Sequence, residues 1–186
     1  MVFVKVCGVR DLETALAVCE AGADAVGFVF HRRSPRFVEL EVAGKIALSI
    51  PPQVVRVAVI KSADEFVPKM LEFCHLVQVY EPLDIDPSRL ILGVSGFTSA
   101  EAAYYLLDSS HGTGRFAAYP EDLFGLPRER VIVSGGLNPE NVASVIAKYR
   151  PFGVDVSSGV ERAPGVKDLE LVRRFIERVR EAERCL

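Results

Sequence analysis

The chain has 186 residues, of which 49% are apolar, and its formal charge is −3 at pH 7. This apolar content suffices for one hydrophobic core, and no Pro-, Gly- or Ser-rich linker interrupts it, so we expect a single domain over residues 1–186. The mixed charges offer no basic stripe to nucleic acid or a membrane surface, and no apolar stretch approaches the roughly 20 residues that span a bilayer. Residues 1–5 lead directly into an apolar run instead of a signal peptide, which favours the cytoplasm.

Cysteine and histidine usage gives no sign of a metal centre or of disulfides. The cysteines are Cys7, Cys19, Cys74 and Cys185, and the histidines are His31, His75 and His111. The cysteines show no C-x-x-C spacing and no histidine cluster near them, so we expect no bound metal, and the scattered histidines receive no role. Asparagine and glutamine are scarce beside glutamate and arginine, which favours a thermophilic source.

Short β-branched runs alternate with amphipathic stretches along the chain. Eight runs are predicted strands, at residues 2–6, 25–30, 54–60, 76–80, 90–94, 105–108, 131–133 and 154–156. Apolar strands separated by helices are typical of a parallel sheet that is covered on both faces, and eight such units predict an α/β fold of the (β/α)8 or TIM-barrel class. A doubly wound open sheet is the alternative, but K-V-C-G-V-R after the first strand lacks the G-x-G-x-x-G spacing of its phosphate turn.

Helical patterns fill several of the gaps between these strands. The first opens at Asp11 and ends at Gly22. Its predicted buried face consists of Leu12, Ala15, Leu16 and Cys19. A second helix is predicted over residues 40–50, where two prolines stop it, and a third over about 64–73, with Phe66, Met70 and Phe73 buried.

Two of the gaps are too short or too rich in proline for a full helix. Residues 81–89 read E-P-L-D-I-D-P-S-R, and residues 95–104 offer at most a capped turn or two. Helices 4 and 5 of the barrel are therefore predicted to be shortened or missing. Their loss would let a compact barrel fit into fewer than the usual minimum of about 200 residues.

Two turns near the C-terminus have the composition of a phosphate site. V-I-V-S-G-G-L-N-P-E-N-V at 131–142 and G-V-D-V-S-S-G-V-E at 153–161 both run from an apolar strand into small residues. Glycine and serine let an anion approach the backbone N–H groups, and barrel enzymes often bind phosphate with the loops after strands 7 and 8. We therefore predict that Gly135, Gly136, Ser157 and Ser158 bind phosphate; ordinary strand-to-helix turns are the alternative.

Several motifs, in order along the chain, resemble phosphoribosylanthranilate isomerase. They are K-V-C-G-V at 5–9, G-A-D-A-V-G-F-V-F and S-P-R within 22–36, L-L-D at 106–108, H-G-T-G-R-F at 111–116, and the two turn segments above. The chain departs from the family where Q-L-H-G is common but Gln78-Val79-Tyr80-Glu81 stands here, and where F-D-W is common but Phe116-Ala117-Ala118-Tyr119 stands here. These departures concern substrate contacts made by the two loops.

The resemblance implies an isomerase of tryptophan biosynthesis. The reaction would be the Amadori rearrangement of N-(5′-phosphoribosyl)anthranilate to 1-(o-carboxyphenylamino)-1-deoxyribulose 5-phosphate, with no cofactor. Another phosphosugar isomerase or epimerase barrel, and a barrel that binds phosphosugars without turnover, stay open as alternatives. Whether the histidine-pathway analogue is also a substrate, and whether the chain is a monomer or a homodimer, also stay open.

The rearrangement needs one acid and one base. The resemblance makes Cys7 the general base and Asp108 the general acid, each at the end of a predicted strand. A buried small hydrophobe and a turn carboxylate are the alternative roles of these two residues. Because a free thiol is mostly protonated and a free carboxyl mostly ionised at pH 7, we expect the site to lower the cysteine pKa and raise the aspartate pKa.

Two further residues are assigned to the substrate. The resemblance implies that Arg36 holds the anthranilate carboxylate, which a guanidinium can meet with two parallel hydrogen bonds. Arg32 and Arg33 are interpreted as solvated charges. For Asp155, on the last strand, the resemblance implies binding of a ribose hydroxyl; a supporting role for other site residues is the alternative.

Overall fold

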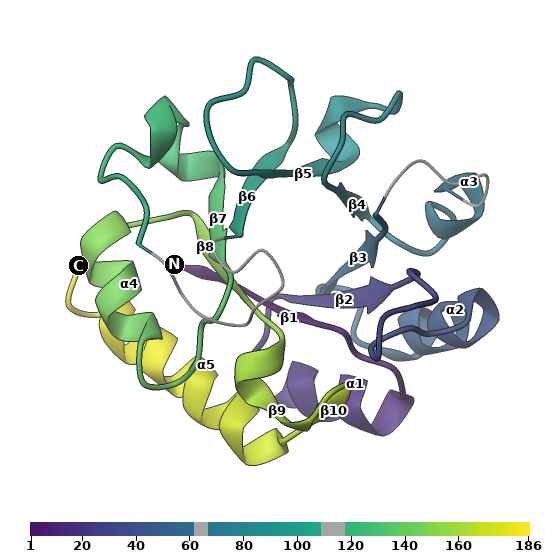
Figure 1. The fold of residues 1–186 in the computed structure, drawn as a ribbon. Coiled ribbons are helices and arrows are strands. Elements are labelled where there is room, and N and C mark those ends of the chain that lie inside the picture. Colours follow the sequence, from purple (N-terminus) through teal and green to yellow (C-terminus); the bar gives the residue numbers. More distant parts are fainter. Residues whose placement is uncertain (62–66, 109–117) are drawn as a thin grey trace.

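The structure is a computed structural model that describes residues 1–61, 67–108 and 118–186 (Figure 1). Its strands are β1 (Phe3–Cys7), β2 (Ala25–Val29), β3 (Val55–Val59), β4 (Leu76–Val79), β5 (Leu90–Val94), β6 (Tyr104–Asp108), β7 (Val131–Ser134) and β8 (Gly153–Val156). Each pairs in parallel with the next, and β8 pairs with β1, so the sheet closes into a barrel. The predicted (β/α)8 barrel is confirmed, and the open sheet is excluded.

Five α-helices are present among the described residues. They are α1 (Leu12–Glu20), α2 (Leu40–Ser49), α3 (Val67–Met70), α4 (Val142–Tyr149) and α5 (Leu169–Glu183). The carboxylate of Asp11 accepts the Thr14 N–H at the start of α1, and Asp168 accepts two N–H groups at the start of α5. These side chains satisfy amides that have no partner within the helix, which fixes where each helix begins. The predicted helix over 64–73 falls partly outside the described residues, Phe66 included, and its described part ends at Met70.

The predicted buried face of α1 is wrong in part. Leu12 and Leu16 are 40% and 38% exposed, whereas Ala15 and Val18 are fully buried. The apolar stripe of α1 that packs on the barrel is narrow and consists of Ala15 and Val18, and the larger leucines lie on either side of it. Periodicity identified the helix, but four apolar residues at near-helical spacing allowed more than one choice of inner face.

The connections around β4, β5 and β6 carry little helix. Between β4 and β5 the chain makes only the 3-10 turn η1 (Pro87–Arg89), and the described residues between β5 and β6 contain no helix. The shortening of helices 4 and 5 is confirmed. The described residues between β6 and β7 also contain only 3-10 turns, η2 (Leu123–Gly125) and η3 (Arg128–Arg130), a loss that the sequence did not predict. In Figure 1 the long helices accordingly lie beside β7, β8, β1, β2 and β3.

The alternation of side chains along the strands produces two cores. One lies between the sheet and the helices; the other fills the barrel interior and includes Val57, Ile91, Leu106 and Ile132. At the amino ends of the strands the rings of Phe3, Tyr104 and Phe152 stack, with the Tyr104 and Phe152 centroids 4.7 Å apart. This stack closes one end of the interior, so that a pocket reaching the barrel interior opens at the carboxyl ends of the strands. Among the described residues, no helix is long and apolar enough to cross a membrane.

Candidate active site

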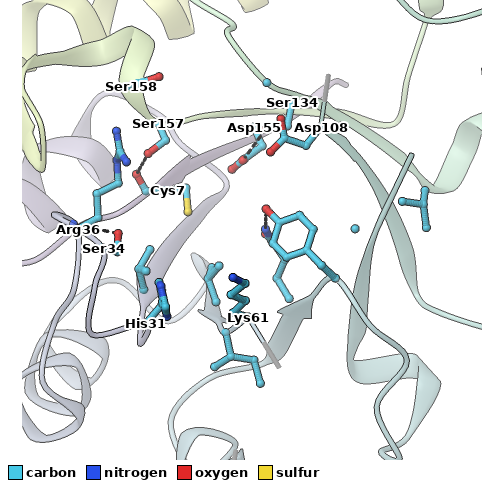
Figure 2. A pocket seen from close by; sticks show the side chains of 18 of the residues that line it. Cys7, His31, Ser34, Arg36, Lys61, Asp108, Ser134, Asp155, Ser157 and Ser158 are labelled. Atoms are coloured by element: carbon cyan, nitrogen blue, oxygen red, sulfur yellow. Dashed lines mark hydrogen bonds between the residues drawn. The ribbon is translucent and has the colours of Figure 1, made fainter. Parts of the chain in front are cut away.

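A cavity of about 840 Å³ opens at the carboxyl ends of the barrel strands (Figure 2). Every residue that the sequence assigned to the site lines it: Cys7, Arg36, Asp108, Gly135, Gly136, Asp155, Ser157 and Ser158. They come from β1, β6, β8 and the loops that follow β2, β7 and β8. Separate segments of the chain therefore converge on one pocket, as catalytic residues do in this fold.

Cys7 is the last residue of β1 and is 7% exposed. Gly27 on the neighbouring strand leaves space for the thiol, since a Cβ at that position would lie 2.9 Å from Sγ. Burial raises the pKa of the Cys7 thiol, and although Lys5 and Lys167 act to lower it, the net pKa stays above the ordinary value. The expected lowering of the cysteine pKa is wrong for the unliganded protein, because the two ammonium groups do not outweigh the loss of hydration.

A buried network lies directly below the cavity. Lys5 occupies an inward position of β1 and its Nζ donates to Asp155 Oδ1 at 2.6 Å, while Ser134 Oγ donates to Asp155 Oδ2 at 3.0 Å. Burial alone would lower the pKa of Lys5, but the adjacent carboxylate raises it above its ordinary value, so the ammonium stays charged. Both oxygens of Asp155 thus have partners within the protein, and a fixed positive charge stands near Cys7.

Asp108 ends β6, where it pairs in register with Ser134 of β7. Its side chain is partly buried and reaches the same cavity as Cys7 from a different strand (Figure 2). The H-G-T-G-R-F motif that follows at 111–116, with Phe116 and Ala117 of the second family departure, lies outside the described residues.

Arg36 belongs to a second network of charges at the rim. Its Nε and Nη2 donate to the two carboxylate oxygens of Glu161 at 2.8 and 2.7 Å, and Lys167 Nζ donates to Glu161 Oε1 at 2.9 Å. Burial acts to raise the pKa of Glu161, but the bonds from Arg36 and Lys167 lower it below its ordinary value. A guanidinium has five N–H donors, so the two that serve Glu161 leave others for a ligand.

The stem of Arg36 is held by the turn after β1. Gly8 has φ +83°, and a Cβ there would lie 2.6 Å from Arg36 Cδ. Only glycine combines this backbone conformation with so close an approach. The glycine of the K-V-C-G motif, Gly8, therefore lets the side chain of Arg36 pack against the turn directly after Cys7.

The two predicted phosphate turns lie against each other. Gly135 and Gly136 have φ +81° and +74°, and Asn141 Nδ2 donates to the carbonyl of Gly136 at 3.0 Å, which holds the first turn. In the second turn, a Cβ on Gly159 would lie 1.8 Å from the carbonyl oxygen of Leu137. Glycine at 159 thus permits the contact that brings the two turns to one end of the cavity.

The second turn also connects the charge network at the rim to Cys7. Lys167 lies on β10 (Val166–Lys167), which pairs with β9 (Glu161–Ala163) after the 3-10 turn η4 (Ser158–Val160). Its Nζ donates to the carbonyl of Ser157 at 3.0 Å, and Ser157 Oγ donates to the carbonyl of Cys7 at 3.1 Å. Bonds thus connect Arg36, through Glu161 and Lys167, to the backbone of Cys7.

Sequence analysis did not identify Lys5, Glu161 or Lys167 as site residues, nor His31, which lines the cavity wall. One signal was available for Lys5. The alternation along β1 places it on the same face as Cys7, and a charged residue at an inward barrel position calls for a partner. Among the described residues, no group of three His, Cys, Asp or Glu side chains could hold a metal ion.

Comparisons with known proteins agree with these observations. A family model described as N-(5′-phosphoribosyl)anthranilate (PRA) isomerase matches residues 4–178. An N-(5′-phosphoribosyl)anthranilate isomerase from Geobacter sp. (strain M21) is 38% identical, over 95% of this chain and 97% of the relative.

Solved structures show the same similarity. A crystal structure of phosphoribosyl anthranilate isomerase in complex with reduced 1-(o-carboxyphenylamino)-1-deoxyribulose 5-phosphate matches with a TM-score of 0.81 and 36% identity, covering 97% of this chain and 100% of that one. The structure of monomers generated from the dimeric enzyme of Thermotoga maritima matches with a TM-score of 0.80 and 35% identity, with the same coverage. The chain is thus similar to these proteins in sequence and in fold along nearly its whole length.

Proposed function

The chain belongs to the N-(5′-phosphoribosyl)anthranilate isomerase family, and we propose that it performs the Amadori rearrangement of tryptophan biosynthesis with Cys7 as general base and Asp108 as general acid. The observation that carries the assignment is the convergence of Cys7, Asp108 and both glycine- and serine-rich turns on one cavity. A thiol and a carboxyl from different strands can act on opposite sides of one substrate, while the turns hold its phosphate.

The proposed sequence of proton transfers needs no further reactant. Asp108 gives a proton to the ring oxygen, the C–O bond breaks, and the nitrogen lone pair forms the C=N bond of a Schiff base. The Cys7 thiolate then removes the proton from the adjacent carbon, and that electron pair forms a C=C bond while the C=N electrons return to nitrogen. The resulting enol becomes the ketone when its hydroxyl proton leaves and a proton returns to carbon 1, which restores both groups.

The base has to lose its proton before it can act. Burial keeps the Cys7 pKa above its ordinary value, while Lys5 and Lys167 favour the thiolate. The thiolate fraction of the free enzyme therefore grows as the pH rises, and the two lysines increase that fraction. Asp155 is proposed to hold the Lys5 ammonium charged and in place in addition to lining the cavity, although its own carboxylate acts to raise the Cys7 pKa.

The ends of the substrate are assigned to the two sides of the cavity. The phosphate would accept hydrogen bonds from backbone N–H groups of the turns at Gly135, Gly136, Ser157 and Ser158. Arg36 would bind the anthranilate carboxylate with the N–H donors that Glu161 does not use. We propose no metal and no cofactor for this reaction, since proton transfer suffices.

The function is tested by turnover. Purified protein treated with a chelator should consume N-(5′-phosphoribosyl)anthranilate. The loss of anthranilate fluorescence measures this consumption. Binding without turnover would indicate a phosphosugar-binding barrel, and activity on other phosphosugars alone would indicate another isomerase or epimerase. The histidine-pathway analogue, assayed in parallel, would show whether the substrate range is relaxed.

We propose that the protein works in the cytoplasm on this small phosphorylated substrate and needs neither nucleic acid nor membrane. The Thermotoga maritima relative is described as dimeric, with monomers obtained from it. Both a monomer and a homodimer therefore fit this chain, and sedimentation velocity over a range of protein concentrations distinguishes them.

A further inference from the structure

One polar atom in the cavity wall has no hydrogen-bond partner in the described part of the chain. Gln78 lies on β4 with its side chain in the wall, and the residue is 2% exposed. Its Nε2 donates to Tyr80 Oη over 3.4 Å, but its buried Oε1 has no hydrogen-bond partner among the residues that the structure describes. An unpaired buried acceptor destabilises a folded protein by about 1–3 kcal/mol, so its presence in a substrate cavity needs an explanation.

The alternative orientation of the amide does not remove the problem. If the oxygen and nitrogen of Gln78 exchange places, Tyr80 Oη can donate to Oε1, but Nε2 then occupies the position without a partner. Either way, the amide presents one polar atom that no described residue pairs. A ligand hydroxyl can both donate and accept, so it satisfies the amide in either orientation, whereas a carboxylate or a phosphate satisfies only one.

Tyr80 adds a second polar group at the same place. Its ring packs on Gly93 of β5, where a Cβ would lie 2.4 Å from Cδ1, so glycine is required for the ring to lie there. Burial raises the pKa of the Tyr80 phenol, as do the nearby Asp108 and Cys7. The phenol therefore stays protonated and can donate a hydrogen bond close to the proposed acid and base.

We propose that Gln78 and Tyr80 form a hydroxyl-binding subsite on the β4 wall, which holds a hydroxyl of the substrate's sugar chain beside the reacting carbons. This inference rests on the proposed function. When substrate binds, the unpaired atom of the Gln78 amide would form a hydrogen bond with that hydroxyl, and the Tyr80 phenol would be the second hydrogen-bond partner of the hydroxyl. A site built in this way rejects analogues without the hydroxyl, because the Gln78 amide would then stay buried with a polar atom that no described residue pairs.

The test compares two variants with matched controls. Gln78→Met keeps the approximate volume of the side chain without its polar atoms, and Tyr80→Phe keeps the ring without its hydroxyl. Gln53→Met changes an exposed glutamine in the turn before β3, and Tyr104→Phe changes a tyrosine of the aromatic stack at the opposite end. Kinetics with N-(5′-phosphoribosyl)anthranilate, fluorescence titration with the reduced product analogue, and thermal unfolding are measured for each protein.

We expect kcat/KM and analogue affinity to fall about 3- to 10-fold in each of the two cavity variants, the size of one neutral hydrogen bond. The double variant should lose less than the product of the two single losses, because both side chains bind one hydroxyl. The melting temperature of Gln78→Met should be unchanged or higher, since the substitution removes an unpaired polar group. Both controls should keep wild-type kinetics.

Three outcomes would overturn the subsite. Wild-type kinetics and affinity in both cavity variants would show that the amide and phenol do not touch substrate. A Gln78→Met protein that melts lower or fails to fold would show that the amide is structural. If the double variant lost the full product of the two single losses in kcat/KM and affinity, the two side chains would not bind the same hydroxyl. No turnover by the wild-type protein is a different result, because it would remove the proposed function and the subsite with it.

Discussion

At the amino ends of the barrel strands, arginines bond mainly to main-chain carbonyls, whereas at the carboxyl ends the cations of the site pair with carboxylates. Arg56 shows the first pattern: it is 8% exposed and donates to the carbonyls of Ala47, Ile50, Pro52 and Val54, all at 3.0–3.1 Å. Arg89 bonds to carbonyls around the start of β4, and Arg128 bonds to carbonyls at another loop of this end. Arg180 bonds to the carbonyls of Val2 and Gly22 and also pairs with the carboxylates of Asp24 and Glu183. These carbonyls are ones that helix ends and turns leave without partners.

The carboxyl ends use charge in another way. Lys5 pairs with Asp155, and Arg36 and Lys167 share Glu161. A carboxylate fixes the position of a cation without consuming all of its N–H donors, so the cation can still attract an anionic substrate. The comparison teaches that arginines at one end stabilise the fold, while charges at the other end prepare a site. Substitutions at the two ends should therefore change different measurements.

The largest effect is expected from the proposed acid and base. Cys7→Ser and Asp108→Asn should each lower kcat by at least about 100-fold, the lower range for a positioned acid or base, because neither replacement carries out the proton transfer. Both proteins should bind the reduced product analogue and unfold at nearly the wild-type temperature. Near-normal kcat in either purified variant would contradict that residue's role.

Arg56→Met, at the amino end, should lower stability and leave catalysis unchanged. Several buried carbonyls would lose their donor while the apolar stem is kept, so we expect the free energy of unfolding to fall by about 3 kcal/mol, with unchanged kcat/KM per folded molecule. Chemical denaturation measures the loss. Arg130→Met, an exposed arginine of the same end, is the control and should be close to wild type. Altered kinetics in folded Arg56→Met protein would show that the two ends are not independent.

Arg36→Lys tests whether the rim charges also act by geometry. Lysine keeps the charge, but it cannot make two parallel hydrogen bonds to a carboxylate. The fall in kcat/KM should therefore correspond to a loss of about 1–3 kcal/mol in transition-state stabilisation. Arg32→Lys is the matched control, since Arg32 is exposed and its contact with Glu39 is 3.7 Å long. A fully active Arg36→Lys enzyme would remove Arg36 from substrate binding.

The two ends also differ in how far sequence predicts them. All eight strands were located to within about two residues, because β-branched runs ended by small or polar residues identify them without tertiary information. Arg56 and its carbonyl partners, and the pair of Arg36 and Glu161, were not predicted, although both involve ordinary residues. The first depends on the detailed path of a loop, and the second joins residues 125 positions apart.

Residues of the site were predictable where a motif and a strand end coincide. Cys7, Asp108 and the two small-residue turns were identified in this way, and they do line one cavity. The direction of the Cys7 pKa was not predictable, because it depends on the balance between burial and two lysines whose positions only the fold reveals. Gln78 was visible only as part of a departure from the family pattern, since its unpaired oxygen is a property of three-dimensional packing.

The smallest expected effect concerns pH and belongs to the amino end. His75 Nδ1 accepts the N–H of Arg56 at 3.1 Å, which requires the neutral ring, and burial lowers the His75 pKa, as do Arg56 and Arg89. A group whose pKa is lower in the folded state contributes stability that is complete above its unfolded value of about 6.5 and is lost as the pH falls through the folded value. Stability should therefore decline on acidification below about pH 6.5, and His75→Gln, which keeps an acceptor without titrating, should reduce that decline. The pH dependence of kcat/KM should stay that of the wild type, because the proposed acid and base lie at the other end of the barrel. If His75→Gln instead altered the pH dependence of catalysis and left that of unfolding unchanged, the division of labour between the two ends would be wrong.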